Sequence, residues 1–141
     1  MILSVEKNLT SYLEGALKSM GLHTEARTSF ITYVLDPLIL LGDAYNLCRY
    51  WLPAFLKHQY VALRFVNQAA YERCAPLDIT PTPDVVTRVY MVFKGVPEED
   101  WMGHEEDLDV GRWSSIVGVD VERGRDTSLF RVLEWGGMEV V

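Results

Sequence analysis

The sequence has few cysteines, little positive charge and no long uninterrupted apolar run. Its 141 residues carry 13 lysines and arginines against 20 aspartates and glutamates, which gives a net charge of −7. Because binding to the phosphates of nucleic acids needs a positive surface, we expect no nucleic-acid partner. The most apolar stretch, VLDPLILLGDAY, contains Asp36 and Asp43 and is far shorter than a transmembrane helix. We therefore expect no membrane partner either.

Only two cysteines are present, Cys48 and Cys74, and neither belongs to a CxxC pair or stands near a histidine. This usage favours two reduced, mostly buried thiols in a cytoplasmic protein. The first residues, MILSVEKNLTSY, lack the basic start and the cleavage site of a signal peptide. Both observations predict a cytoplasmic location.

Motifs for metal binding, phosphate binding and nucleophilic catalysis are also missing. The histidines His23, His58 and His104 have no carboxylate at metal-ligand spacing. His104 has acidic neighbours, but adjacent positions on a loop do not converge on one ion. No GxSxG elbow and no glycine-rich phosphate loop occur. We expect no metal and no cofactor, and the sequence leaves open whether the protein is an enzyme.

The order of the predicted elements favours an α+β fold. Apolar residues recur at helical spacing over 5–20 and 24–35, and a further helical pattern begins near Asp43. Beyond His58 the period changes to two, in the segments YVALRFV, VVTRVYMVFKG and SLFRVLEW. PLDITPTPD reads as a short edge strand followed by a turn, and AAYERC as a helical turn. We therefore predict one domain over 1–141, with N-terminal helices packed on a small antiparallel sheet of about three to five strands.

Several residues have predicted local roles. Ser4 and Thr24 are N-cap candidates, and Gly21 is suited to the left-handed residue that ends a helix. Asp84 is expected to cap the turn before its strand through its own backbone. The pair Gly136-Gly137 is expected to end the last strand. Residues 96–109 are acidic and predict an exposed irregular loop.

Five stretches of the chain resemble a domain family of bacterial and fungal proteins. They are GLHTEARTSFITY, YWLP, ALRFVNQAAYE, APLDITPTPDVVTRVYMVFKG and FRVLEWGG. The family pattern reads LGLxExxxxFIxYWLP, then AxLxIxPxPD, RVFM and EWGG. It is specific for the domain but implies no chemistry. In the family, FITY runs directly into WLP, so the resemblance implies that residues 34–50 are an insert that interrupts one helix.

The most suggestive charged residues are Glu25, Arg27, Glu72, Asp84, Arg88 and Glu134. Arg88 lies within an apolar strand, and Glu134 lies beside Trp135 in another. If these strands pair, a contact between Arg88 and a carboxylate would be bidentate and partly buried. Such a contact is either a salt bridge that fixes a helix against the sheet or part of a functional pocket.

Two functions follow from these alternatives. The first is a non-enzymatic cytoplasmic module that binds a protein or a small ligand. The second is a small enzyme with a carboxylate and arginine site built from Glu25, Glu72, Arg88 and Glu134. Trp101, in the acidic segment, is either a contact for a partner or a side chain that folds back over the sheet.

Overall fold

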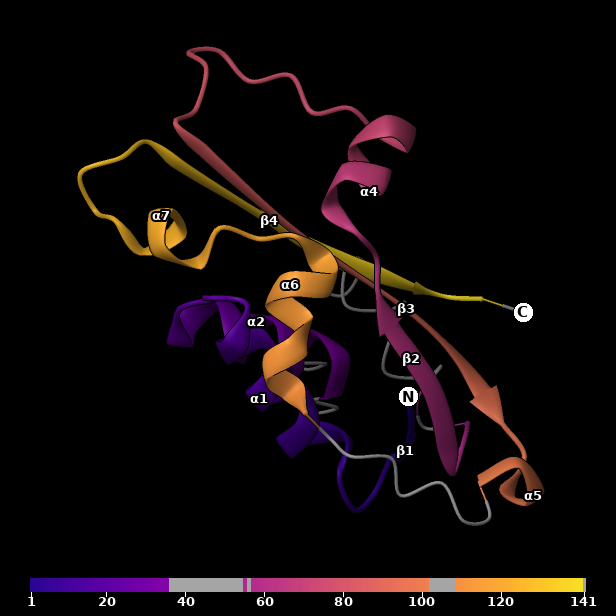
Figure 1. The fold of residues 1–141 in the computed structure, drawn as a ribbon. Helices are drawn as coiled ribbons and strands as arrows, with labels where there is room; N and C mark the ends of the chain where they lie inside the picture. Colours follow the sequence, from indigo (N-terminus) through magenta and orange to yellow (C-terminus); the bar gives the residue numbers. More distant parts are fainter. Residues whose placement is uncertain (36–54, 56, 102–108, 141) are drawn as a thin grey trace, which may run out of the picture.

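The computed structural model describes residues 1–35, 55, 57–101 and 109–140. Within these residues the chain forms helices and one four-stranded sheet, which confirms the α+β class (Figure 1). The elements in chain order are β1 (Ile2–Ser4), α1 (Leu9–Ser19), α2 (Thr24–Leu35), β2 (Tyr60–Phe65), α4 (Gln68–Cys74), β3 (Val85–Val96), α5 (Glu98–Trp101), the 3-10 turn η2 (Val110–Arg112), α6 (Trp113–Val117), α7 (Val121–Arg125) and β4 (Arg131–Glu139).

The sheet is mixed, whereas the sequence predicted an antiparallel one. The strand order is β1-β2-β3-β4. The β1–β2 and β2–β3 pairs are antiparallel, but β4 runs parallel to β3, with Arg88 opposite Glu134. A parallel pair needs a long crossover between its strands. The segment that contains α5, α6 and α7 supplies this crossover, and strand periodicity carries no information about strand direction.

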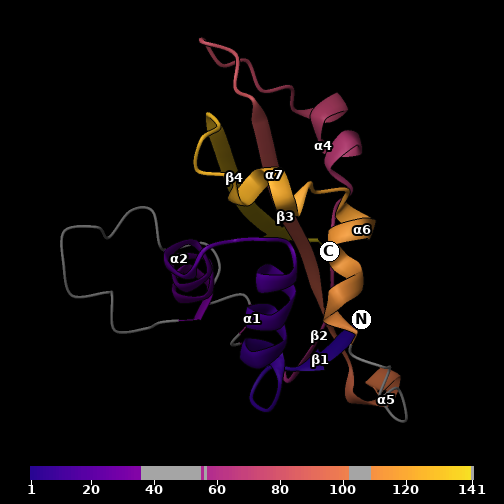
Figure 2. The same cartoon turned by 60° about the vertical axis from the view of Figure 1, so that its left-hand side comes forward.

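The core lies on one face of the sheet, under α1, α2 and α6. Residues of β3 with odd numbers, such as Val89 and Phe93, point into it and are almost fully buried. Phe30 of α2 packs on Trp135 with ring centroids 5.4 Å apart, and Trp113 packs edge-on against Phe65. Each fully buried large apolar side chain contributes about 1.5–3 kcal/mol. Figure 2 shows α1 and α2 on one side of the sheet and α4 on the other.

The N-terminus differs from the sequence prediction. Residues 2–4 form strand β1, with Leu3 opposite Val61, and helix α1 begins only at Leu9. The hydroxyl of Ser4 accepts a hydrogen bond from the Lys7 amide at 3.3 Å, in the turn between β1 and α1. Ser4 is therefore not the N-cap of the helix. The short strand forms because β2 offers it an open edge, which no local pattern reveals.

The connection between α1 and α2 matches the predicted left-handed glycine and corrects the predicted cap. Gly21 has a φ of 84°, its amide donates to the Lys18 carbonyl, and the Leu22 amide donates to the Leu17 carbonyl. These two bonds make a Schellman motif. At the start of α2, Nδ1 of His23 accepts the Ala26 amide at 2.9 Å, so His23 is the cap in place of Thr24.

Strand β4 continues through the two glycines that were expected to end it. It reaches Glu139, and Gly136 stands opposite Tyr90. A Cβ atom on Gly136 would lie 3.3 Å from the Tyr90 ring, so the ring occupies the space that a side chain would fill. A further correction concerns residues 76–84, which form no strand, since their prolines cannot donate to a ladder. AAYERC, by contrast, lies in α4 as predicted.

Some predictions fall wholly or partly outside the described residues. The predicted insert 34–50 overlaps them only at the end of α2, and Cys48 and His104 lie beyond them. The predicted acidic loop 96–109 is described at its two ends. There Glu98–Trp101 forms the single turn α5, so this part is helical where an irregular loop was expected. Cys74 is a free thiol as predicted, but it is exposed and not buried.

Candidate functional site

The site is formed where α4 crosses strands β3 and β4, on the face of the sheet opposite the core. The alternation of β3 turns Arg88 to this face, because its neighbours Thr87 and Val89 point to the core. Helix α4 is fixed at its start by Asn67, whose Oδ1 accepts the Ala70 amide at 3.1 Å. The Asn67 amide group also donates to the Ile116 carbonyl at 3.1 Å. This contact ties the start of α4 to α6.

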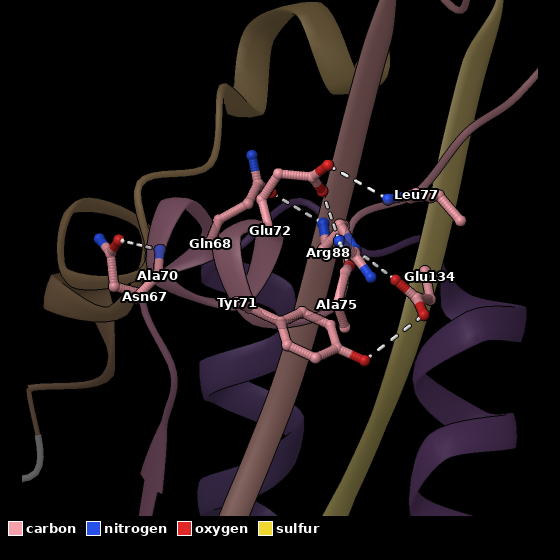
Figure 3. A network of polar contacts seen from close by, with 9 residues as sticks. All are labelled: Asn67, Gln68, Ala70, Tyr71, Glu72, Ala75, Leu77, Arg88 and Glu134. Atoms are coloured by element: carbon pink, nitrogen blue, oxygen red, sulfur yellow. Dashed lines mark hydrogen bonds and ion pairs between the residues drawn. The ribbon is translucent and has the colours of Figure 1, made fainter.

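Arg88 is the centre of a polar network that joins three elements (Figure 3). Its Nε donates to Glu134 of β4, and its Nη1 donates to Glu72 of α4. Nη1 also donates to the Ala75 carbonyl at 2.6 Å. Only 3% of the Arg88 side chain is exposed, against 48% for Glu72 and 37% for Glu134. The guanidinium is thus buried beneath two half-exposed carboxylates.

Further contacts hold the backbone and the carboxylates of this network in place. Oε1 of Gln68 accepts the backbone amide of Arg88 at 2.8 Å, which anchors the first turn of α4 on β3. Oε1 of Glu72 accepts the Leu77 amide at 3.1 Å. The hydroxyl of Tyr71 lies 3.5 Å from Glu134 Oε1, a long contact.

The ring of Tyr71 covers the guanidinium. The Cζ of Arg88 lies 4.2 Å from the centre of the Tyr71 ring, a cation–π contact. The Tyr71 ring stacks on Tyr90 with centroids 4.7 Å apart and an interplanar angle of 29°. Gly136 leaves the space for Tyr90 beside β4. The guanidinium of Arg88 is thus enclosed by its own strand β3, by the Tyr71 ring and by α4.

The surroundings of Arg88 and Tyr71 keep these two groups in their ordinary protonation states. The hydrogen bonds to Glu134 and Glu72 raise the pKa of Arg88 above its usual value, against the opposing effect of burial. Burial, together with the negative charge of Glu134, raises the pKa of the Tyr71 hydroxyl. Arg88 therefore stays charged and Tyr71 stays neutral near pH 7, and neither is suited to act as a general base.

The structure brings together three of the four predicted site residues. Glu72, Arg88 and Glu134 meet, as the sequence suggested, in an ion-pair network between a helix and the sheet. Glu25 does not join them, because α2 packs on the core face while Arg88 lies on the opposite one. It is exposed in the first turn of α2. Trp101 is the last residue of α5, and its side chain lies outside the part of the chain that the structure describes.

The two other charged residues of the predicted set have structural roles elsewhere. Arg27 pairs with Glu14 of α1 at 2.7 Å and also donates to the Leu22 carbonyl, which holds α2 against α1. Asp84 Oδ2 accepts the Phe130 amide at 2.7 Å. Asp84 thus joins the starts of β3 and β4, and the predicted turn cap within its own backbone was wrong.

A groove of about 340 Å³ lies beside the network, between α4, β3 and the end of α6. Its walls combine polar side chains with apolar ones, and it is lined by Asn67, Gln68, Ala69, Glu72, Leu77, Val86, Arg88, Val117 and Gly118. A smaller cavity of about 140 Å³ lies near His23, Thr87 and Arg131. It contains none of the four predicted residues, so the groove is the only one of these two cavities that adjoins the network.

Sequence reasoning missed Tyr71 and Gln68. Both lie on the short helix α4, whose register against β3 is decided by tertiary packing. It also missed the contact of His58 Nε2 with Glu139 Oε1 at 2.9 Å, over Gly95, where a Cβ atom would overlap the imidazole ring. The one available signal for that contact was the glycine near the end of an otherwise β-branched and aromatic strand.

Neither a metal site in the described part of the chain nor a known relative points to a function for the protein. Among the described residues, no three histidine, cysteine or acidic side chains are grouped so that they could hold a metal ion. None of the described helices is both long and apolar enough to span a bilayer. No protein-family model, curated protein or solved structure matches the chain. The resemblance to the bacterial and fungal domain family therefore stays a prediction.

Proposed function

We propose that the protein is a non-enzymatic binding module of the cytoplasm that takes up a cationic group in the groove beside α4. The observation that carries the proposal is the contrast between a buried, fully engaged arginine and two half-exposed carboxylates. The free, exposed thiol of Cys74 supports a reducing compartment.

The charge balance of the network favours a cationic ligand. One guanidinium faces two carboxylates, which leaves an excess of one negative charge when both carboxylates are ionised. The chain as a whole also has a net charge of −7. An anionic ligand would meet Glu72 at the wall of the groove, whereas an ammonium or guanidinium group would find an acceptor there.

The apolar part of the groove supplies the remaining contact. Leu77, Val86 and Val117 line it, and the side chain of Ile116 is exposed close by on α6. A ligand with an aliphatic stem and a charged end, such as a lysine or arginine side chain of a partner protein, combines both requirements. A polyamine has the same chemistry.

The alternative, a small enzyme with a carboxylate and arginine site, has less support. Both carboxylates already accept hydrogen bonds from Arg88, and one of them also holds the Leu77 amide. An activated acid or base needs a pKa tuned toward the working pH, and the pKa values of Arg88 and Tyr71 are both moved away from neutrality. The geometry therefore favours a structural role for Arg88 and the two carboxylates over a catalytic one.

Agmatine, which carries an amine and a guanidinium on a four-carbon stem, is a suitable first probe. Titration of the 15N-labelled protein should give saturable chemical-shift changes at the amides of Gln68, Glu72 and Gly118. Glu72→Gln should weaken the binding about two- to fivefold, as expected for loss of an exposed ion pair. The melting temperature of the variant would show that it is folded.

Glu122→Gln is the matched control, since it removes one exposed carboxylate from α7, outside the residues that line the groove. It should leave the affinity unchanged. Glutamate, an anionic probe, should cause no shifts in the groove. Absence of saturable shifts, or equal weakening by both variants, would contradict the proposal.

A further inference from the structure

Strand β4 forms one border of the sheet over its whole length. It pairs with β3 on one side, and no strand among the described residues pairs with its other side (Figures 1 and 2). The opposite border is β1, which has three residues, whereas β4 has nine. A long open strand edge offers a row of backbone donors and acceptors to another strand.

The hydrogen bonds at both ends of β4 show which backbone groups face outward. The Val140 amide donates to the Phe93 carbonyl at 2.8 Å, and the Phe130 carbonyl accepts the Asp84 amide at 2.9 Å. Residues with even numbers therefore direct their backbone toward β3. Successive residues of a strand alternate, so the outward groups belong to Arg131, Leu133, Trp135, Gly137 and Glu139.

Apolar side chains are concentrated along this border. Phe130, Met138 and Val140 are exposed, and Ile116 is the only other exposed large apolar residue among those described. Residues 131–139 contain no proline and no lysine, the residues that commonly protect an open edge. The border thus has the features of an interaction surface.

We infer that β4 pairs antiparallel with β4 of a second copy of this chain, about a two-fold axis at Trp135. In this register Arg131 of each copy stands opposite Glu139 of the other, so two ion pairs form. Phe130 meets Val140, and Val132 meets Met138, which covers the exposed apolar side chains. Odd-numbered residues face each other, so Arg131, Leu133, Gly137 and Glu139 alone can form about eight backbone hydrogen bonds between the copies.

Other pairings of β4 between two copies form fewer of these ion pairs and backbone hydrogen bonds. A shift of two residues in either direction removes both Arg131–Glu139 pairs. In the centred register Glu134 faces Gly136, so no like charges stand opposite each other. Pairing of β4 with β1 of another copy would use only three residues and, being head-to-tail, would leave an open edge on each new copy. The symmetric pairing closes after two copies.

A charge swap tests the inference. Sedimentation velocity of the intact chain over a range of concentrations should show a dimer in equilibrium with the monomer. Arg131→Glu or Glu139→Arg alone should weaken the dimer about tenfold or more, because each places like charges opposite each other at both ends. The double variant should restore it.

If the double variant restores the dimer, the restored ion pair must form between two copies. Within one chain Arg131 and Glu139 lie eight strand residues apart, about 26 Å. Within one copy Arg131 donates to the Gly124 carbonyl and Glu139 contacts His58, and the swap repairs neither contact. Melting temperatures would show that the variants are folded.

Hydrogen exchange of the unaltered protein provides a second readout. At low concentration the amides of Leu133 and Gly137 should exchange faster than that of Val140, and at high concentration they should become protected. A monomer at every concentration would overturn the inference. So would a dimer that the single variants leave intact, that the double variant fails to restore, or that forms without protecting these amides.

Discussion

At the scale of single residues, Arg88 is the most constrained charge among the described residues. Burial of a guanidinium is costly unless its donors find acceptors. Here three acceptors meet it, namely Glu72 of α4, the carbonyl of Ala75 at the end of α4, and Glu134 of β4. The residue therefore holds α4 on the sheet, and its removal leaves those acceptors without their partner.

Arg88→Met should lower the free energy of unfolding by about 1–4 kcal/mol, because it leaves one carbonyl and two carboxylates unpaired. The lower part of this range allows for the solvent that reaches both carboxylates. Urea denaturation, followed by circular dichroism, would measure the change.

Arg64→Met is the matched control. Arg64 lies in β2 on the same face of the sheet and is exposed. This variant should change the free energy of unfolding by less than about 0.5 kcal/mol. An equal effect of the two substitutions would show that the network around Arg88 contributes nothing specific.

Asp126 gives a second prediction at this scale. Its Oδ1 accepts the Ser128 hydroxyl at 2.7 Å and the Ser128 amide at 2.9 Å. These bonds lower the pKa of the Asp126 carboxyl below its ordinary value. Its contribution to stability is therefore present above the unfolded-state pKa and is lost as the pH falls through the folded-state value.

Ser128→Ala removes the hydroxyl donor, so the pKa of Asp126 should rise toward its ordinary value. An NMR titration of the Asp126 carboxyl carbon would measure it. Ser115→Ala, a substitution of an exposed serine on α6, should leave the pKa unchanged. A pKa that does not move in Ser128→Ala would show that the hydroxyl is not the cause.

At the scale of elements, the end of α1 is determined by one glycine. Gly21 takes a left-handed conformation that an L side chain adopts only at a cost of about 1–2 kcal/mol. A Cβ atom there would also lie 3.2 Å from Val121 Cγ1. The turn that follows places His23 at the start of α2 and so sets the angle between the two helices.

Gly21→Ala should therefore destabilise the protein by about 1–2 kcal/mol, measured by thermal or chemical unfolding. Gly124→Ala should have the opposite sign or no effect. Gly124 lies in α7 with an ordinary φ, and a Cβ there would make an ordinary contact with Thr87. Equal destabilisation by both would mean that the left-handed conformation of Gly21 is not the cause.

At the scale of the whole molecule, one layer of helices covers the core face of the sheet while α4 covers part of the other face. The core cluster contains residues of β1, α1, α2, β2, β3 and α6. Phe55 also belongs to it and stacks on Phe93 at 3.9 Å. The chain therefore returns to the core after the predicted insert.

Deletion of residues 34–50, with Tyr33 joined to Trp51, should give a folded protein at least as stable as the full chain. The reason is that a longer surface segment changes the closure entropy by only about 0.6 kcal/mol per doubling of length. Soluble expression and thermal melting would measure the outcome. An aggregated or unfolded product would mean that residues such as Leu38 and Leu41 belong to the core.

Much of the secondary structure follows from the sequence because its causes are local. The alternation of β2 and β3, the stripe of α1 and the left-handed Gly21 depend on neighbours within a few residues. The presence of Arg88 in an apolar strand was likewise enough to predict an ion pair with a carboxylate. Of the four proposed site residues, Glu72, Arg88 and Glu134 were grouped correctly.

The tertiary structure alone decided what depends on distant segments. The parallel direction of β4 follows from the path of its crossover, and β1 exists because β2 has an open edge. Glu25 lies outside the site because α2 packs on the opposite face of the sheet. His23 caps the start of α2 because the preceding turn presents its Nδ1 to the Ala26 amide. The spacing of apolar and polar residues along the chain determines which side chains lie on one face of a helix or strand. Which residues those side chains contact depends on how that helix or strand packs in the tertiary structure.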